Sequence, residues 1–214
     1  MEYLIKEITP FSGKYIVKAS ELSTGESRTW LVAREFSENV VLSEGEVISD
    51  EAACELSDAE RLTEAASKAL DALSYSTLSR SALVSKLRVK YGFEKEISER
   101  AAQYAVSKGY IDEAAQAELF ASRAVRTKKW GKRRIVAELC AKGYPKNTAE
   151  RAACTVSDGE YLEALRSLAG KKKTIAAKNA EQYRKTAASL LRLGHSPSDI
   201  KKVMAELREH GAEE

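Results

Sequence analysis

A dense group of basic residues in the middle of the chain is the part of the sequence best suited to binding chemistry. Its members are the cations of one short stretch and the tryptophan between them: Arg123, Arg126, Lys128, Lys129, Trp130, Lys132, Arg133 and Arg134. Guanidinium and ammonium groups bind phosphate oxygens, and the guanidinium can form two parallel hydrogen bonds. We name this group the basic block, and we expect it to bind the phosphate backbone of a nucleic acid.

The distribution of charge along the chain supports this expectation. Residues 121–151 contain ten basic and two acidic residues, whereas residues 1–64 contain six basic and fourteen acidic ones, and the overall net charge of +3 hides the difference. A concentrated excess of one charge repels itself, which favours a polyanionic or acidic partner. A solvated helix face without any partner is the alternative. Lys171, Lys172 and Lys173 form a second, looser basic group that a solvated linker would explain equally well.

Trp130 has two interpretations. Contacts with phosphates give an affinity that falls with salt and carries little sequence preference, whereas stacking on bases requires an exposed aromatic ring. Trp130 is the one aromatic residue of the basic block that could stack on a base. The other interpretation, which we prefer, is an anchor at a helix junction that packs on Ile135.

Other kinds of site find little support in the sequence. A phosphate-binding loop would need a glycine where Leu165 stands, five residues before Gly170. His195 and His210 lie near predicted helix ends, where we expect surface or capping roles, and no cysteine or carboxylate stands at ligand spacing around them. We therefore expect neither an enzyme nor a metal or cofactor site.

The three cysteines, Cys54, Cys140 and Cys154, are widely spaced among residues that favour helices. We expect them to be small buried hydrophobic side chains rather than disulfides or metal ligands. No apolar run approaches the roughly 20 residues that span a bilayer, and the amino terminus lacks the basic and then apolar pattern of a signal peptide. These features predict a monomer in the cytoplasm with no membrane contact.

The first 50 residues are predicted to form strands. Short runs rich in β-branched and aromatic residues cover Tyr3–Thr9, Lys14–Ala19 and Arg28–Ala33, and glycine turns separate them. A further short run at Val47 and Ile48 could add a last strand. We expect a small antiparallel β unit over residues 1–50.

The remainder is predicted to be helical. Ser57, Asn147 and Ser157 each precede a glutamate by three residues, a pattern that caps helix starts, and Ser196 precedes a proline. Glycines preceded by basic residues mark helix ends. These signals predict nine helices, at about residues 58–74, 79–91, 95–108, 112–127, 131–142, 147–156, 158–169, 178–193 and 196–210.

The nine helices fall into three groups of three, because one pattern recurs in the second helix of each group. A pair of residues four apart precedes a glycine in three places: Leu83 and Leu87 before Gly92, Ile135 and Leu139 before Gly143, and Thr186 and Leu190 before Gly194. A single unit of this size buries little surface alone, so neighbouring units must stack. The predicted fold class is mainly α, an elongated tandem array of three three-helix repeats over residues 57–110, 111–156 and 157–211, preceded by the small antiparallel β unit.

Several segments also match a known family in their order and spacing. They are Leu78–Leu83 with Leu87, Gly109–Glu113, Phe120–Arg123, Trp130–Ile135 with Glu138 and Leu139, Lys142–Tyr144, and Leu190–His195 with Asp199 and Ile200. Together these segments resemble the RecX regulators of the RecA recombinase. The resemblance implies a protein of tandem three-helix repeats that binds the RecA nucleoprotein filament, usually limits its extension or activity, and can contact single- and double-stranded DNA more weakly.

Two functions from different classes follow. The first is a regulator, and specifically an inhibitor, of RecA that docks along the filament and modulates recombination, DNA repair and the SOS response. The second is a general nucleic-acid-binding helical module without a recombinase partner. A helical adaptor similar to a sigma-factor binder is a weaker third alternative.

Overall fold

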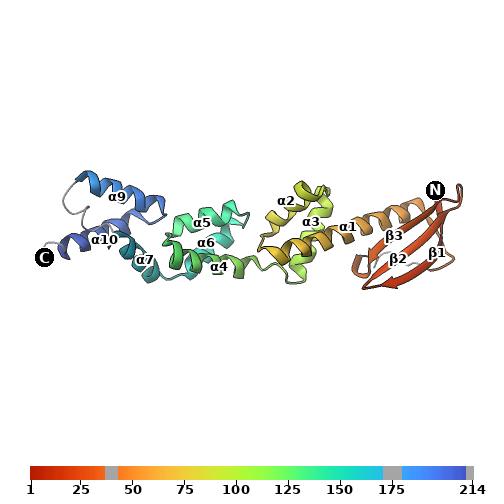
Figure 1. Ribbon diagram of the computed structural model, residues 1–214, viewed down its shortest axis with the longest axis horizontal. Coiled ribbons are helices and arrows are strands. Elements are labelled where there is room, and N and C mark those ends of the chain that lie inside the picture. The colour runs from red at the N-terminus through yellow and green to blue at the C-terminus, as the bar shows by residue number, and fades with distance from the viewer. Residues whose placement is uncertain (37–42, 171–179, 211–214) are drawn as a thin grey trace. The chain divides into compact units, whose positions relative to one another are not determined.

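The computed structural model describes residues 1–36, 43–170 and 180–210 of the 214-residue chain, without the side chains of the last three residues of the third range. The chain divides into two compact units, residues 1–111 and residues 112–214, which we call unit 1 and unit 2. The described helices and strands are drawn in Figure 1.

Unit 1 begins with a four-stranded antiparallel sheet in the order β3-β2-β1-β4. Its strands are β1 (Glu2–Phe11), β2 (Lys14–Glu21), β3 (Ser27–Ala33) and β4 (Val47–Ser49). The turn between β1 and β2 places Ser12 and Gly13 at positive φ, a conformation that glycine adopts without strain. The register shifts between Ile5 and Glu7, which marks a bulge in β1. The expected small β unit is therefore present, and β4 is the short last strand.

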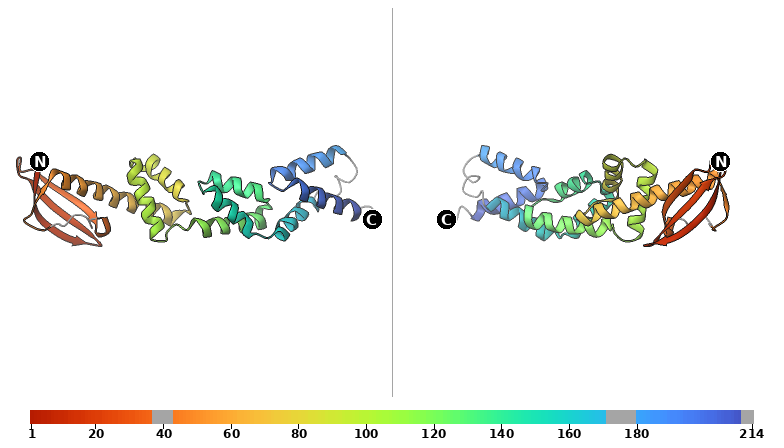
Figure 2. Two further views of the ribbon diagram at one scale, coloured as in Figure 1. Left: turned by 180° about the vertical axis from the view of Figure 1, so that it is seen from behind. Right: turned by 45° about the vertical axis from the view of Figure 1, so that its right-hand side comes forward.

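The first half of helix α1 (Asp50–Tyr75) packs against one face of this sheet, and the rest extends beyond it (Figure 2). The fully buried side chains of Ile5 and Trp30 pack with those of Leu56 and its neighbours on α1. The helix starts at Ser49, whose hydroxyl accepts a hydrogen bond from the backbone N–H of Ala52.

The prediction that this helix starts at Ser57 was wrong. Ser57 lies inside α1, and its hydroxyl donates to the carbonyl of Ala53 one turn earlier. The same hydroxyl accepts hydrogen bonds from Trp30 Nε1 at 3.0 Å and from the guanidinium of Arg28 at 2.9 Å. Ser57 therefore connects the helix to strand β3 instead of capping a helix.

The second half of α1 packs against α2 (Arg80–Tyr91) and α3 (Lys95–Ser107). Leu83 and Leu87 are fully buried in this three-helix core. Helix α2 is capped by Ser79 and ends at Gly92, which has φ of 75° and donates its N–H back to the helix. The first of the three repeated patterns thus forms a buried helix face followed by a left-handed turn.

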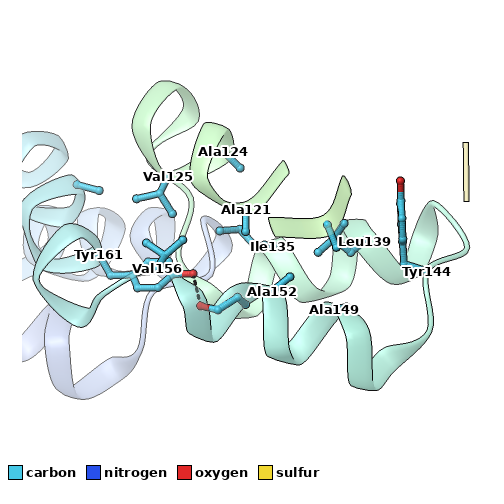
Figure 3. Close-up of a cluster of buried hydrophobic side chains, with 13 residues drawn as sticks. Ala121, Ala124, Val125, Ile135, Leu139, Tyr144, Ala149, Ala152, Val156 and Tyr161 are labelled. Atoms are coloured by element: carbon cyan, nitrogen blue, oxygen red, sulfur yellow. Dashed lines mark hydrogen bonds between the residues drawn. The ribbon is translucent and has the colours of Figure 1, made fainter. Parts of the chain in front are cut away.

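Unit 2 begins with α4 (Glu113–Arg123), α5 (Lys132–Ala141) and α6 (Lys146–Thr155). Figure 3 shows their shared hydrophobic cluster, in which Ile135 and Leu139 of α5 are fully buried. Tyr161 belongs to the next helix but lies in this cluster, and its hydroxyl donates to the Ala153 carbonyl at 2.8 Å.

The rest of unit 2 contains α7 (Asp158–Gly170), α9 (Ala180–Arg192) and α10 (Pro197–His210). Their cluster is built on buried side chains such as Leu165, Leu190 and Val203. The two capping serines predicted in this part of the chain, Ser157 and Ser196, are confirmed. The hydroxyl of Ser157 accepts from the N–H of Glu160 at 3.2 Å, and that of Ser196 accepts from the N–H of Asp199 at 3.1 Å.

The predicted fold class, mainly α with a small antiparallel β unit at the start, is confirmed, and the described ranges contain nine α-helices. Two further boundaries differ from the prediction. Helix α6 starts at Lys146 after Pro145, so Asn147 is not its cap. The predicted helix over residues 112–127 is α4 followed by a π-helical segment, Ala124–Lys128. The division into three repeats remains our interpretation of these helices.

Candidate nucleic-acid interface

The basic block occupies the junction between α4 and α5, where the backbone leaves regular helical geometry. The π-helical segment ends at Lys129, which has φ of 56°, unusual for a residue with a side chain. Its N–H donates to the Val125 carbonyl at 3.2 Å, and the N–H of Trp130 donates to Ala124 at 3.3 Å. These bonds close the wider turn, so the chain changes direction into α5 without leaving these two amides unpaired.

The indole of Trp130 lies against the core of unit 2. It is half-buried, it packs on the cluster that contains Ile135, and its centroid lies 6.3 Å from that of Phe120. The ammonium of Lys128 lies 4.3 Å and the guanidinium of Arg134 4.9 Å from the indole centroid. This geometry supports the anchor interpretation, because two cations and the core already occupy the surroundings of the ring.

The guanidinium of Arg134 also forms hydrogen bonds within the protein. Its guanidinium donates to Glu138 at 2.9 Å and to the backbone carbonyl of Arg192 at 3.4 Å. Lys132 points elsewhere, with its ammonium 5.9 Å from the ring centroid of Tyr161 on α7. These two cations therefore contribute to the packing of α5 against α9 and α7.

Arg123, Arg126 and Arg133 differ from Arg134 because all three side chains are exposed. Within the described ranges none of them forms an ion pair. Lys128 is exposed as well, above the indole of Trp130. The exposed cations of the basic block are thus these three arginines and Lys128, and Lys129 is half-buried.

A close backbone contact joins the start of α5 to the end of α9. The N–H of Gly131 donates to the Leu193 carbonyl at 2.8 Å, and the N–H of Arg133 donates to the Gly194 carbonyl at 3.2 Å. A Cβ atom on Gly131 would lie 2.4 Å from the Gly194 carbonyl carbon, and one on Gly194 would lie 2.3 Å from the Arg134 nitrogen. Neither position has room for a side chain, so both residues must be glycine. Gly194 also has φ of 87°, which favours glycine.

His195 completes this contact. Of the surface or capping role that we expected for it, the surface role was wrong. Its side chain is buried, and Nε2 lies 2.9 Å from the Lys129 carbonyl, to which it can only donate. Burial lowers the pKa of the imidazole below its ordinary value, although the bond to Lys129 and the charge of Asp199 act in the opposite direction. His195 takes the place that Phe93 and Tyr144 occupy after the glycines of the other two patterns. The side chain of His210 lies outside the described residues.

A pocket of about 440 Å³ lies beside this contact, where the starts of α5, α7 and α10 meet. Two cations, Lys132 and Arg133, and two carboxylates, Asp158 and Asp199, are among its lining residues. The charges balance, so the pocket lacks the positive excess that a phosphate site requires.

The expectation that the cysteines are buried was wrong. The cysteines are free and exposed, not buried, because Cys54, Cys140 and Cys154 each occupy the solvent side of a helix whose preceding residue is buried. Lys171, Lys172 and Lys173 lie outside the described residues. In the described ranges no group of three or more metal-binding side chains occurs, and none of the helices there is both long and apolar enough to cross a membrane.

Helix α2 of unit 1 is basic, a feature that the charge pattern of the whole chain does not indicate. This helix carries Arg80, Lys86, Arg88 and Lys90 and no acidic residue. Residues 65–120 together contain eight basic and seven acidic residues, so the charge of the whole stretch does not reveal this helix. A count for each helix would have revealed it.

Comparison with known proteins places these features in a family. A family model described as the second three-helix domain of RecX matches residues 112–152, which contain the whole basic block. The regulatory protein RecX of Chlorobium limicola is 36% identical over 154 residues, which cover 70% of this chain and 93% of that protein.

Solved structures agree at the level of the fold. A crystal structure of regulatory protein RecX matches with a TM-score of 0.77 and 21% identity, covering 94% of this chain and 98% of that one. RecX from Lactobacillus salivarius matches with a TM-score of 0.64 and 24% identity, covering 70% of this chain and 97% of that one. The identity to the Chlorobium protein, which this chain spans almost completely, shows that the chain belongs to the RecX family of regulatory proteins.

Proposed function

We propose that this chain regulates a RecA recombinase, that it acts as an inhibitor, and that it binds the RecA–DNA filament. Membership of the RecX family is the observation that carries the proposal. The position of the basic block within the matched second three-helix domain supports a contact with DNA in that complex.

The exposed arginines of the basic block are suited to the phosphate backbone. Arg123, Arg126 and Arg133 form no ion pair within the described ranges, so a phosphate does not have to displace a carboxylate from them. Contacts of this kind release counterions, which makes the affinity fall with salt, and they carry little sequence preference. DNA contact is in this proposal an electrostatic, weaker addition to the contact with the recombinase.

A titration against DNA-dependent ATP hydrolysis by RecA tests the proposal. We expect inhibition at protein concentrations well below that of the DNA, because the protein acts on the filament and does not have to cover the DNA. Inhibition should also persist when excess DNA is added. A general nucleic-acid-binding module would inhibit only when the DNA is coated, and excess DNA would relieve it.

The role of the basic block is tested separately on naked single-stranded DNA. Replacing Arg123, Arg126 and Arg133 by alanine should weaken binding and reduce the slope of log K against log salt by about 2, at roughly 0.7 for each lost phosphate contact. Lys129 is kept, because its backbone has φ of 56° and its carbonyl holds His195.

The matched control replaces three other cations of unit 2, Arg151, Lys201 and Lys202, which are also exposed. This variant removes the same charge from other helices. It should reduce the slope of log K against log salt less than the triple variant of the basic block does. Equal losses in the two triple variants would show that net charge, not the basic block, determines binding.

A further inference from the structure

Four charged side chains line the pocket beside the contact between Gly131 and Gly194. They are Lys132 and Arg133 at the start of α5, Asp158 in the first turn of α7 and Asp199 in the first turn of α10. Within the described ranges none of the four forms an ion pair. Opposite charges attract each other, so the helices hold these groups too far apart to pair. A ligand that carries both charges could contact both kinds of group at once.

The start of α5 favours the negative end of such a ligand. The hydroxyls of Ser157 and Ser196 cap α7 and α10, whereas α5 begins after Gly131 without a side-chain cap. In the described part of the chain the N–H of Lys132 has no hydrogen-bond partner. Free amides give a helix start a partial positive charge, to which the side chains of Lys132 and Arg133 add. A carboxylate is therefore suited to this side of the pocket.

The imidazole of His195 calls for a hydrogen-bond donor in the ligand. The residue is 3% exposed and lines the pocket, and its Nε2 donates to the Lys129 carbonyl at 2.9 Å. Burial lowers the pKa of the ring, so the ring is neutral and Nδ1 carries a lone pair. No donor to Nδ1 occurs among the described residues. A buried acceptor without a donor is unfavourable, and an N–H of a ligand would satisfy it.

The carboxylate of Asp199 lies on the same side of the pocket as this ring. Its charge acts on the imidazole, and one of its oxygens accepts a hydrogen bond from the Ser196 hydroxyl at 2.6 Å. An ammonium group that donates to Nδ1 would therefore also lie close to a carboxylate. The positive end of the ligand is suited to this side of the pocket.

The size and walls of the pocket limit the ligand further. Its volume of about 440 Å³ lies at the small end of the range of roughly 300–1,000 Å³ for ligand pockets. The buried ring of Tyr161 and the half-buried side chain of Leu162 supply an apolar part of the wall. A small molecule with one charge of each sign and a short side chain suits these walls.

We infer that this pocket binds a free α-amino acid as a zwitterion. Its carboxylate lies at the start of α5, against Lys132 and Arg133. Its ammonium group lies between Asp158 and Asp199 and donates to Nδ1 of His195. Each charge of the ligand then meets groups of the opposite sign, and charge-assisted hydrogen bonds are stronger than neutral ones. The inference goes beyond the proposed function and depends on neither RecA nor DNA.

Thermal unfolding of the full chain in the presence of each of the common L-amino acids tests the inference. A ligand that binds only the folded chain raises the Tm by mass action, and we expect at least one amino acid at about 10 mM to raise it by about 2 °C or more. Isothermal titration calorimetry then compares that amino acid with its N-acetyl and amide derivatives. Each derivative lacks one of the two charges and should bind at least about tenfold more weakly, because it loses a hydrogen bond to a charged group.

The D158N variant assigns the binding to this pocket. Asparagine keeps the shape of the exposed Asp158 side chain but not its charge. D158N should bind the amino acid at least about tenfold more weakly, and it should bind the N-acetyl derivative, which has no ammonium group, as the original chain does. The matched control is E163Q, which removes an exposed carboxylate from the same helix outside the pocket and should leave both affinities unchanged. Both variants should unfold near the original Tm without ligand, because exposed charges contribute little to stability.

The inference is overturned if no amino acid raises the Tm. Equal affinities for the amino acid and its N-acetyl derivative would also overturn it, because recognition would then not involve the ammonium group. Equal losses in D158N and E163Q would place the ligand outside this pocket. The assays contain neither RecA nor DNA, so failure of the recombinase proposal would not change their outcome.

Discussion

Leu139 shows how one buried side chain supports the basic block. It is fully buried in the cluster that holds α4, α5 and α6 together, and α5 carries Arg133. Truncation to alanine should lower the free energy of unfolding by about 2–5 kcal/mol, through lost burial and the cavity that remains. Chemical denaturation measures this. Leu119, 51% exposed on α4, is the control, and L119A should cost well under about 1 kcal/mol. Equal costs would contradict the assignment of Leu139 to the core.

His195 makes the stability of unit 2 depend on pH. Its pKa is lowered in the folded protein because burial disfavours the imidazolium, so the unfolded chain binds this proton more readily. The stabilising contribution is therefore complete above the ordinary pKa of 6.5 and is lost as the pH falls below it.

Replacement of His195 by glutamine isolates this effect, because the amide can still donate to the Lys129 carbonyl. The free energy of unfolding should fall less between neutral and mildly acidic pH in H195Q than in the original chain. Carboxylates titrate in both proteins. The difference between the two profiles of unfolding free energy against pH therefore isolates the contribution of His195. Parallel profiles would show that the buried imidazole does not contribute to the pH dependence.

At the level of helices and turns, the contact between Gly131 and Gly194 determines how α5 meets α9. A methyl group at Gly131 would lie 2.4 Å from backbone atoms, which cannot move aside as a flexible side chain could. We expect G131A to cost about 1–3 kcal/mol, the range observed for overpacking. Differential scanning calorimetry can measure the loss.

Gly159 is the control for this substitution. It lies in α7, and an added Cβ there would meet only the Ser157 hydroxyl oxygen, at an ordinary 3.8 Å. G159A should therefore be neutral or slightly stabilising, because alanine favours helices over glycine. A tolerated G131A would mean that the two backbones are not in contact in solution.

The local signals that predicted elements correctly are those in which a residue acts on its own neighbours. Ser157 and Ser196 cap the helices that they precede, and Gly92 and Gly194 end helices at positive φ. The prediction failed where a residue far away in the sequence determines the role of a side chain. Ser57 resembles a cap in sequence, but Trp30 and Arg28 use its hydroxyl inside a longer helix.

The basic block was also only partly predictable from the sequence. The charge pattern identified the basic block, and the spacing of four residues between Arg134 and Glu138 is a local signal for their ion pair. Nothing local indicates that Arg134 would also donate to the Arg192 carbonyl, 58 residues away. The burial of His195 likewise depends on the carbonyl of Lys129, whose left-handed conformation the sequence does not signal. Which cations stay exposed is a property of the tertiary contacts.

For the molecule as a whole, charge separation between first and second helices gives each three-helix group an acidic and a basic helix. The strongest contrast is in unit 1, between the acidic α1 and the acid-free α2. The partner that we propose, a RecA–DNA filament, offers both phosphates and protein surface, so a protein with both kinds of helix suits that proposal.

The three exposed thiols have a practical consequence for experiments. Cys54 lies in unit 1, and Cys140 and Cys154 lie in unit 2. Air oxidation can therefore link copies through intermolecular disulfides during purification, which a reductant prevents. Keeping Cys54 and one of the other two provides natural attachment points for a donor and an acceptor dye. Energy transfer between the dyes would then report the distance between the two units, free in solution and on the filament.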